Sequence, residues 1–245
     1  MKCTGQPFVV RNFVALLAVA PVFLVSSAHA QVYVFGRADF PTDVDPRAVA
    51  TADLNNDGRL DLAIVNRGAD SVSVLLGEAD GTFAQRIDWA VGTAPAAIVS
   101  ADLDGNGAPD LGISNGGGDS VSILLGHGDG TFQGPASYAT GRSPAGIAVG
   151  DFNRDGKQDL AVANRDAPGS VSVLLGNGGG TFRPHVEYST GEGATALVAE
   201  DINGDGEPDL AAANEQAGTL STAAQELLSV ARDMLATTER ATMSD

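Results

Sequence analysis

The nonapeptide DLNNDGRLD at residues 53–61 recurs three times, as DLDGNGAPD at 102–110, DFNRDGKQD at 151–159 and DINGDGEPD at 201–209. The four copies begin 49, 49 and 50 residues apart, and other short motifs keep the same register. SVSVLLG at 71–77 returns as SVSILLG at 120–126 and again as SVSVLLG at 170–176, each time followed by Gly-Thr-Phe. A fixed period of this length indicates a repeat architecture, in which every unit adopts the same local fold.

Each repeat predicts four short strands. AVATADL, made of small and β-branched residues, leads into the first nonapeptide, and LAIVN leads out of it. SVSVLLG alternates Ser with Val, as expected of a strand covered on one face, and Gly-Thr-Phe with the stretch after it predicts the fourth strand. Four strands in about 50 residues are typical of a β-propeller blade. The predicted fold class is all-β, an incomplete β-propeller of three full repeats and a partial fourth.

The repeats are predicted at about 40–86, 87–135, 136–185 and 186–214, inside a propeller region of 31–218. Residues 219–245 match nothing in the repeat, so the fourth unit is expected to stop after Asn214. Open edges of this kind favour self-association. Two alternatives are a helix that covers the open edge and two chains that pair their ends into one ring.

A short C-terminal helix is predicted in the tail. Thr222 followed by Gln225 resembles a capping box, and the apolar residues after it have helical spacing. These are Leu227, Leu228, Ala231 and Leu235.

Residues 1–30 have the parts of a secretory signal peptide in the expected order. Two basic residues precede an apolar run over 13–25, and Ala28-His29-Ala30 supplies a small–x–small cleavage site. The mature chain is therefore expected to begin near Gln31. A membrane anchor is the alternative, but the run is shorter than the ~20 residues that a span needs. The protein is predicted to be secreted, at the cell surface or in the periplasm, without a membrane span.

The composition indicates cations as binding partners. The formal net charge is −17, from 14 basic and 31 acidic residues, which argues against binding to nucleic acid or to an anionic membrane through bulk charge. The one cysteine, Cys3, lies in the predicted signal peptide. An exported chain without disulfides needs another source of stability, and metal ions are the candidates.

The nonapeptides carry the ligands that a hard cation prefers. Side-chain oxygens stand at positions 1, 3, 5 and 9, and Gly at position 6 permits a sharp left-handed turn. Position 7 varies, so it is expected to contribute its backbone carbonyl. An all-oxygen set with three carboxylates favours Ca²⁺ over Mg²⁺, at up to four sites, one per repeat. The predicted ligands are Asp53, Asn55, Asp57, Arg59 and Asp61; Asp102, Asp104, Asn106, Ala108 and Asp110; Asp151, Asn153, Asp155, Lys157 and Asp159; and Asp201, Asn203, Asp205, Glu207 and Asp209.

Two other interpretations of the loops were weighed. An EF-hand needs a Glu at position 12 and a following helix, whereas position 12 here is Ile64, Ile113, Val162 or Ala212. Asp, Asn and Gly are also ordinary turn residues. Four loops that keep carboxylates at positions 1 and 9 in register disfavour that simpler explanation.

The sequence resembles the FG-GAP/VCBS-type repeats of integrin-α-like β-propellers over residues about 32–214. The resemblance rests on the loop D-x-[DN]-x-[DN]-G-x-x-D followed by Leu and small residues, and on the later Gly-(Asp or Gly)-Gly-Thr-Phe. It implies Ca²⁺ held between the first two strands of each blade, at one rim of the propeller. Such propellers usually have seven blades, more than the repeats counted here.

The favoured function is an exported, calcium-binding, non-enzymatic binding or adhesion module. Every polar cluster of the repeats is used by the loops, and no Ser–His–Asp order recurs. The expected partner is an extracellular protein or glycan. The alternatives are an accessory propeller domain of a secreted carbohydrate-active or other hydrolytic enzyme whose catalytic part is elsewhere, and a purely structural or degenerate product.

Four aromatic residues recur in the same register: Phe40, Trp89, Tyr138 and Tyr188. Aromatic residues in register are expected to fill the core between blades. A platform on which sugars stack is the alternative.

Overall fold

The computed structural model describes residues 39–223, which contain 17 β-strands and no helix. The predicted signal peptide and most of the predicted C-terminal helix lie outside the described residues. Within them, no helical segment has the length and hydropathy of a membrane span.

The strands form one antiparallel sheet per repeat, and each sheet is called a blade here. Blade 1 contains β1 (Pro46–Ala52), β2 (Asp61–Asn66), β3 (Ser71–Leu75) and β4 (Ile87–Ala90). Blade 2 contains β5 (Pro95–Ala101), β6 (Asp110–Asn115), β7 (Ser120–Leu124) and β8 (Ala136–Ala139). Blade 3 contains β9 (Pro144–Gly150), β10 (Asp159–Asn164), β11 (Ser170–Leu174) and β14 (Val186–Ser189). Blade 4 contains β15 (Ala194–Glu200), β16 (Asp209–Asn214) and β17 (Thr219–Ala223).

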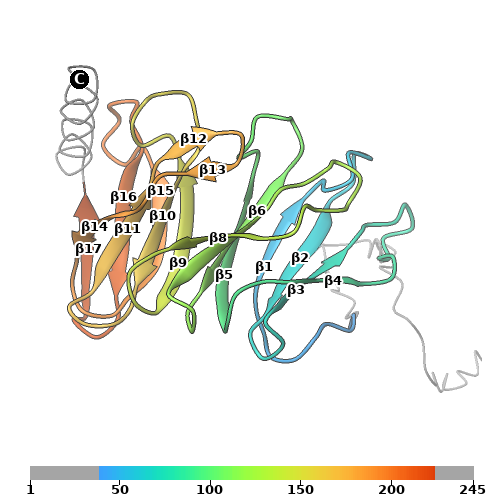
Figure 1. Cartoon of the computed structure of the whole chain (residues 1–245), viewed down its shortest axis with the longest axis horizontal. Coiled ribbons are helices and arrows are strands. Elements are labelled where there is room, and N and C mark those ends of the chain that lie inside the picture. Colours follow the sequence, from blue (N-terminus) through green and yellow to red (C-terminus); the bar gives the residue numbers. More distant parts are fainter. Residues whose placement is uncertain (1–38, 224–245) are drawn as a thin grey trace, which may run out of the picture.

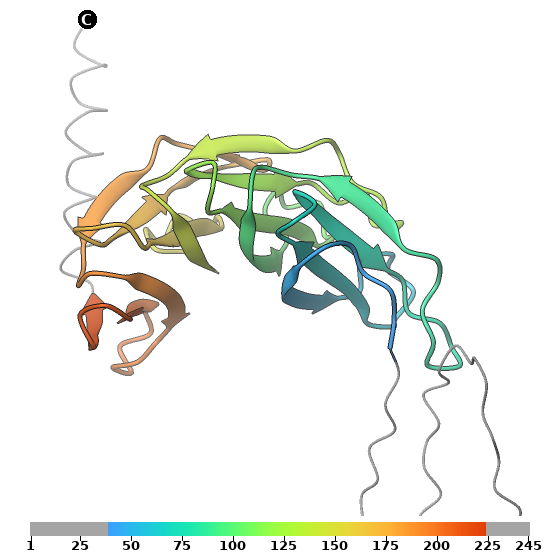
Figure 2. The ribbon, with the colours of Figure 1, turned by 90° about the horizontal axis from the view of Figure 1, so that it is seen from below.

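The blades stand side by side in sequence order (Figure 1). The first strands of successive blades, β1, β5, β9 and β15, are neighbours. Seen along the other direction, the four sheets form an open arc (Figure 2). The all-β fold and its blade-like repeats are confirmed, and the arc is not closed within the described residues.

Gly-Thr-Phe does not belong to the fourth strand, contrary to the prediction. Phe83 and Phe132 make isolated bridges to Gly77 and Gly126, and in blade 3 β12 (Gly176–Gly178) pairs with β13 (Thr181–Phe182) as a separate ribbon. The cause is local hydrogen bonding, because the turn is held by its own side chains. Asp80 accepts hydrogen bonds from the amide of Thr82 at 3.0 Å and from its hydroxyl at 2.6 Å.

The fourth repeat extends further than predicted. β17 pairs with β16 along its length, and the Asn214 side chain is hydrogen-bonded to the Ser221 hydroxyl at 2.8 Å, as the Asn66 side chain is to Ser73 in blade 1. The expected end of the repeat at Asn214 is therefore wrong, and Thr222 lies in a strand rather than at a helix cap. The segment TLSTA is the counterpart of SVSVL, with a serine at the shared position.

The core lies between blades rather than within one blade. Position 2 of each of the first three Asp loops is buried, at 2% exposure for Leu54. The Trp89 ring packs edge-on against Phe132 of the next blade at 5.6 Å, and Tyr138 packs in the same way against Phe182. The prediction that the aromatic register forms blade-to-blade core is confirmed for these rings. Ile202, at position 2 of the fourth loop, is 56% exposed, because no described blade covers it.

Candidate metal centre

The four nonapeptides connect the first and second strands of the four blades, so they lie at one rim of the arc. They are called loops 1 to 4, at residues 53–61, 102–110, 151–159 and 201–209. Each loop is folded around its first carboxylate. In loop 2, Asp102 accepts hydrogen bonds from the backbone amides of Gly105 at 2.7 Å, Asn106 at 3.1 Å and Gly107 at 2.9 Å. The side chain at position 1 thus determines the path of the next five residues.

Two positions of each loop have left-handed backbone. The expected one is Gly at position 6, with φ between 79° and 87° in the four loops. The other is position 4, where φ is 56° at Asn56, 82° at Gly105, 62° at Arg154 and 80° at Gly204. The sequence analysis missed position 4. The signal is weak, because Gly or Asn stands there in loops 1, 2 and 4 but Arg stands there in loop 3.

The carboxylate at position 9 bridges two parts of the blade. Asp110 is fully buried and accepts one hydrogen bond from the Leu103 amide at 2.7 Å and one from the Gly126 amide at 2.7 Å. Asp61 and Asp159 make the equivalent pairs of bonds. In loop 4, one oxygen of Asp209 has no partner among the described residues. The buried position-9 carboxylate therefore ties its loop to the end of the third strand, a role beyond metal binding.

Loop 2 brings three carboxylates to one point. Oxygens of Asp102, Asp104 and Asp110 lie within 4.8 Å of one another. Two oxygens that share one Ca²⁺ at about 2.3–2.6 Å can be at most about twice that far apart, so this spacing fits a common ion. Burial, together with the nearby charge of Asp104, raises the pKa of Asp110 above its ordinary value. A bound cation would favour the charged form of this group.

The other three loops carry Asn at position 3 and their third carboxylate at position 5. Among residues 39–223, loop 2 is the only place where three such carboxylates lie within 4.8 Å of one another. In loop 1 the position-5 carboxylate of Asp57 pairs with the guanidinium of Arg59, and in loop 3 Asp155 pairs with Lys157 at 3.5 Å. In loops 1 and 3 the position-7 side chain is thus a cation that forms an ion pair with one of the predicted ligand carboxylates. Loop 2 has Ala108 there and carries no such competitor.

Loop 3 differs in the pKa of its buried carboxylate. Burial raises the pKa of Asp159 to about 6, and the charges of Asp155 and Asp151 act in the same direction. Loop 4 is linked to loop 3 by an ion pair between Glu207 and Arg154.

Each of the first two loops is also held by the following blade. The Gly130 amide donates to the Leu54 carbonyl at 3.0 Å, and the Gly180 amide donates to the Leu103 carbonyl at 3.2 Å. Both donors belong to the Gly-Thr-Phe turns. The Gly-Thr-Phe turn of one blade therefore supports the Asp loop of the preceding blade.

The arrangement can be compared with known proteins. A family model described as FG-GAP-like repeat matches the chain three times, over residues 53–113, 102–162 and 151–212. A comparison with curated proteins gave no match.

Solved structures share the fold at low sequence identity. A candidate 6-phosphogluconolactonase from Bacteroides uniformis aligns with a TM-score of 0.51 at 15% identity, over 74% of this chain and 54% of that one. A second candidate 6-phosphogluconolactonase, from Bacteroides fragilis, aligns with a TM-score of 0.50 at 16% identity, over 74% and 54%. The BBS1N chain of a complex with ARL6DN aligns with a TM-score of 0.50 at 16% identity, over 74% and 56%. This chain therefore spans just over half of the length of these three structures.

Proposed function

Because the chain belongs to the FG-GAP-like repeat family, we propose that it is an exported, calcium-binding repeat protein that acts as a non-enzymatic binding or adhesion module. Its partner would be an extracellular protein or glycan. The proposed metal ligands are the side-chain oxygens at positions 1, 3, 5 and 9 of each loop, with the backbone carbonyl of position 7. The ion would neutralise the clustered carboxylates and hold each loop in its native turn.

The observation that carries this proposal is the geometry of loop 2. Three carboxylates from one turn lie within 4.8 Å of one another, and one of them, Asp110, is fully buried. Acidic side chains held this close repel one another unless a cation or protons compensate their charge. The donors are all oxygens, without His or Cys, which suits a hard divalent cation of flexible coordination such as Ca²⁺.

The binding role draws support from where the acidic groups lie. The three carboxylates that cluster in the described residues belong to loop 2, and the backbone amides around Asp102 are used to build its turn. These groups serve to hold an ion, which leaves them unsuited to proton transfer with a substrate. Repeats that stack around an arc present extended surfaces, which is how repeat proteins commonly bind partners.

Thermal unfolding in EDTA and in millimolar Ca²⁺ tests the calcium proposal. Extracellular sites of this kind bind with Kd about 10⁻⁴–10⁻³ M, so a tenfold excess of free Ca²⁺ would contribute about 1.4 kcal/mol per site and roughly 5–6 kcal/mol for four sites. The melting temperature is therefore expected to rise by many degrees in Ca²⁺ and by much less in equimolar Mg²⁺. Superimposable melts in EDTA and Ca²⁺ would contradict the proposal.

The export and partner parts have separate tests. Amino-terminal sequencing of protein recovered outside the cytoplasm is expected to begin near Gln31, and a retained Met1 would contradict processing. A pull-down against immobilised matrix proteins and glycans, with and without EDTA, is expected to give a calcium-dependent partner. Retention that is identical with and without EDTA would contradict the expectation and show that partner binding does not depend on the metal.

A further inference from the structure

A cavity of about 520 Å³ opens at the rim opposite to the Asp loops. Its walls come from all four blades, at the beginnings of the first strands and at the turns between second and third strands. β1 begins beside this cavity at Pro46 and ends beside loop 1 at Ala52, so the length of the strand separates the two. This size is within the range of small-molecule sites, about 300–1,000 Å³.

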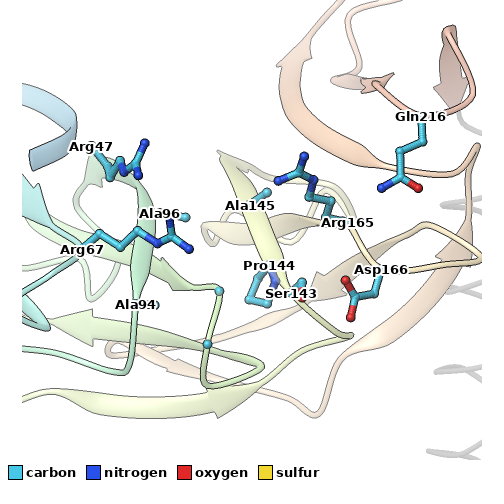
Figure 3. Close-up of a pocket in the computed structure, with 12 residues that line it drawn as sticks. Arg47, Arg67, Ala94, Ala96, Ser143, Pro144, Ala145, Arg165, Asp166 and Gln216 are labelled. Atoms are coloured by element: carbon cyan, nitrogen blue, oxygen red, sulfur yellow. The ribbon is translucent and has the colours of Figure 1, made fainter. Parts of the chain in front are cut away.

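Three arginines line the cavity in a chain with a large negative charge. Arg47 and Arg67 come from blade 1 and Arg165 comes from blade 3. Figure 3 shows their side chains extending into the space between the blades. Only nine Lys and Arg residues occur in the described part of the chain, so one third of them meet here. Random placement on an acidic surface does not predict this grouping.

The three guanidinium groups differ in how firmly they are held. Arg67 has no hydrogen bond or ion pair from its side chain within residues 39–223. Arg165 pairs with Glu215 at 2.9 Å and Arg47 pairs with Asp45 at 3.2 Å, and both pairs are exposed to solvent. Exposed ion pairs contribute little, about 0–1 kcal/mol. A ligand anion can therefore replace Glu215 and Asp45 as the partners of Arg165 and Arg47 at a small cost in free energy, and Arg67 can bind the anion without breaking any ion pair.

The wall between the arginines is made of small residues and is held by hydrogen bonds. Gly116 follows β6, at the position that Arg67 and Arg165 occupy in their own blades, so the space between the two arginines stays open. Its amide donates to the Ala94 carbonyl at 3.0 Å, and the Ala94 amide donates to Asp70 at 2.7 Å. The facing residue Ser143 is held in the same way by Asp119 at 2.9 Å.

The backbone of this wall is strained as well as fixed. Ala94 and Ser143 have φ of 48° and 53°, a left-handed conformation that is unfavourable for residues other than glycine. Hydrogen bonds from the turns of the preceding blades hold both residues in this conformation. The cavity is thus preformed, which lowers the entropic cost of ligand binding.

We infer that this cavity binds a small hydroxylated anion, such as an acidic sugar, with its carboxylate, sulfate or phosphate group between Arg67 and Arg165. Guanidinium groups bind planar or tetrahedral oxyanions through paired, charge-assisted hydrogen bonds. Asp166 and Gln216 also line the cavity and offer oxygens that accept bonds from hydroxyl groups. The site extends the binding role proposed above and uses no ligand of the calcium loops.

Calorimetric titration with four matched sugars tests the inference. Glucuronate, glucose 6-sulfate and glucose 6-phosphate carry the three kinds of anion, and glucose is the neutral control. At least one anion is expected to bind saturably while glucose does not, and the preferred one identifies the source of the oxyanion. Loss of one charge-assisted contact in Arg67→Gln or Arg165→Gln is expected to weaken binding roughly ten- to hundredfold.

Arg183→Gln is the matched control, because it removes the same charge from a residue that directly follows β13, outside the cavity. It is expected to leave the affinity unchanged. Absence of saturable binding by all three anions, or equal weakening by all three variants, would overturn the inference. A protein whose melts do not respond to Ca²⁺ but which binds the anion through Arg67 would overturn the calcium proposal and keep this one.

Discussion

Replacing Asp110 by alanine is expected to destabilise the protein even in the absence of calcium. The carboxylate accepts hydrogen bonds from the amides of Leu103 and Gly126, both at 2.7 Å, and is fully buried. Without it, two buried N–H groups lose their partner, at about 1–3 kcal/mol each. The expected loss is therefore about 2–6 kcal/mol. It is reduced by the cost of burying the carboxylate, a cost seen in its raised pKa, because the alanine variant no longer bears that cost.

Asp104→Ala is the matched control in the same loop. Asp104 is half-buried and accepts bonds only from the Asn106 backbone at 2.9 Å and from the Asn106 side chain at 3.0 Å. Both partners are exposed and can bond to water instead. Its removal also takes away a charge that raises the pKa of Asp110. In EDTA this variant is expected to lose less than about 1 kcal/mol.

Thermal unfolding in EDTA, followed by the same measurement in saturating Ca²⁺, separates the two roles. In EDTA the melting temperature of Asp110→Ala is expected to fall by about 4–24 °C, while that of Asp104→Ala hardly changes. In Ca²⁺ both variants are expected to lose the part of the stabilisation that one site contributes. Equal stability of both variants and the parent in EDTA would refute the structural role of position 9. Full retention of the Ca²⁺ effect in both would refute the proposed ligand set.

Four further outcomes are expected. Asp57→Ala should lose one bound calcium by native mass spectrometry, whereas Arg59→Ala should keep the full complement, because position 7 would contribute its backbone; equal stoichiometry would contradict this. Burial raises the pKa of Asp159 to about 6 from an ordinary 3.8, so protons compete with Ca²⁺ below about pH 6, and calcium titrations should show weaker binding at pH 5 than at pH 7.5. For the same reason, the metal-free protein should gain stability as the pH falls from 6 towards 4. Trp89→Ala removes an edge-on contact between blades and should cost about 3 kcal/mol in urea unfolding. Leu220 is 67% exposed on the open face of blade 4, so sedimentation velocity should show self-association that Leu220→Glu abolishes; a monomeric parent would exclude it.

The sequence was sufficient to predict the blades because the repeat shows each element several times. One copy of SVSVL could be a strand or a buried helix segment, but three near-identical copies, each beginning 18 or 19 residues after the start of an Asp loop, specify a strand with one role. The same reasoning failed for blade 4, where TLSTA has lost the alternating valines and keeps only a serine of the pattern. Pairing with β16, rather than local propensity, makes that segment a strand.

The metal loops were predicted in part for a similar reason. Positions 1, 6 and 9 stood out because their chemistry is the same in every copy. Position 4 did not, because the backbone conformation is shared while the residue changes from Asn56 to Arg154. The hydrogen bonds of Asp110 to Leu103 and Gly126 could not be predicted either, since the two donors become neighbours only after the blade has folded.

The contacts between blades make the four loops unequal, although their sequences look alike. Loops 1 and 2 are each held by an amide of the following blade, at Gly130 and Gly180, so ordering such a loop also orders a blade boundary. In loop 4, Ile202 is exposed and one oxygen of Asp209 lacks a described partner. An ion in loop 1 or loop 2 would therefore stabilise two blades at once, because the turn that it holds is part of both. In a protein built from units that contact only their neighbours, the interaction energies between adjacent units decide how cooperatively the whole arc unfolds.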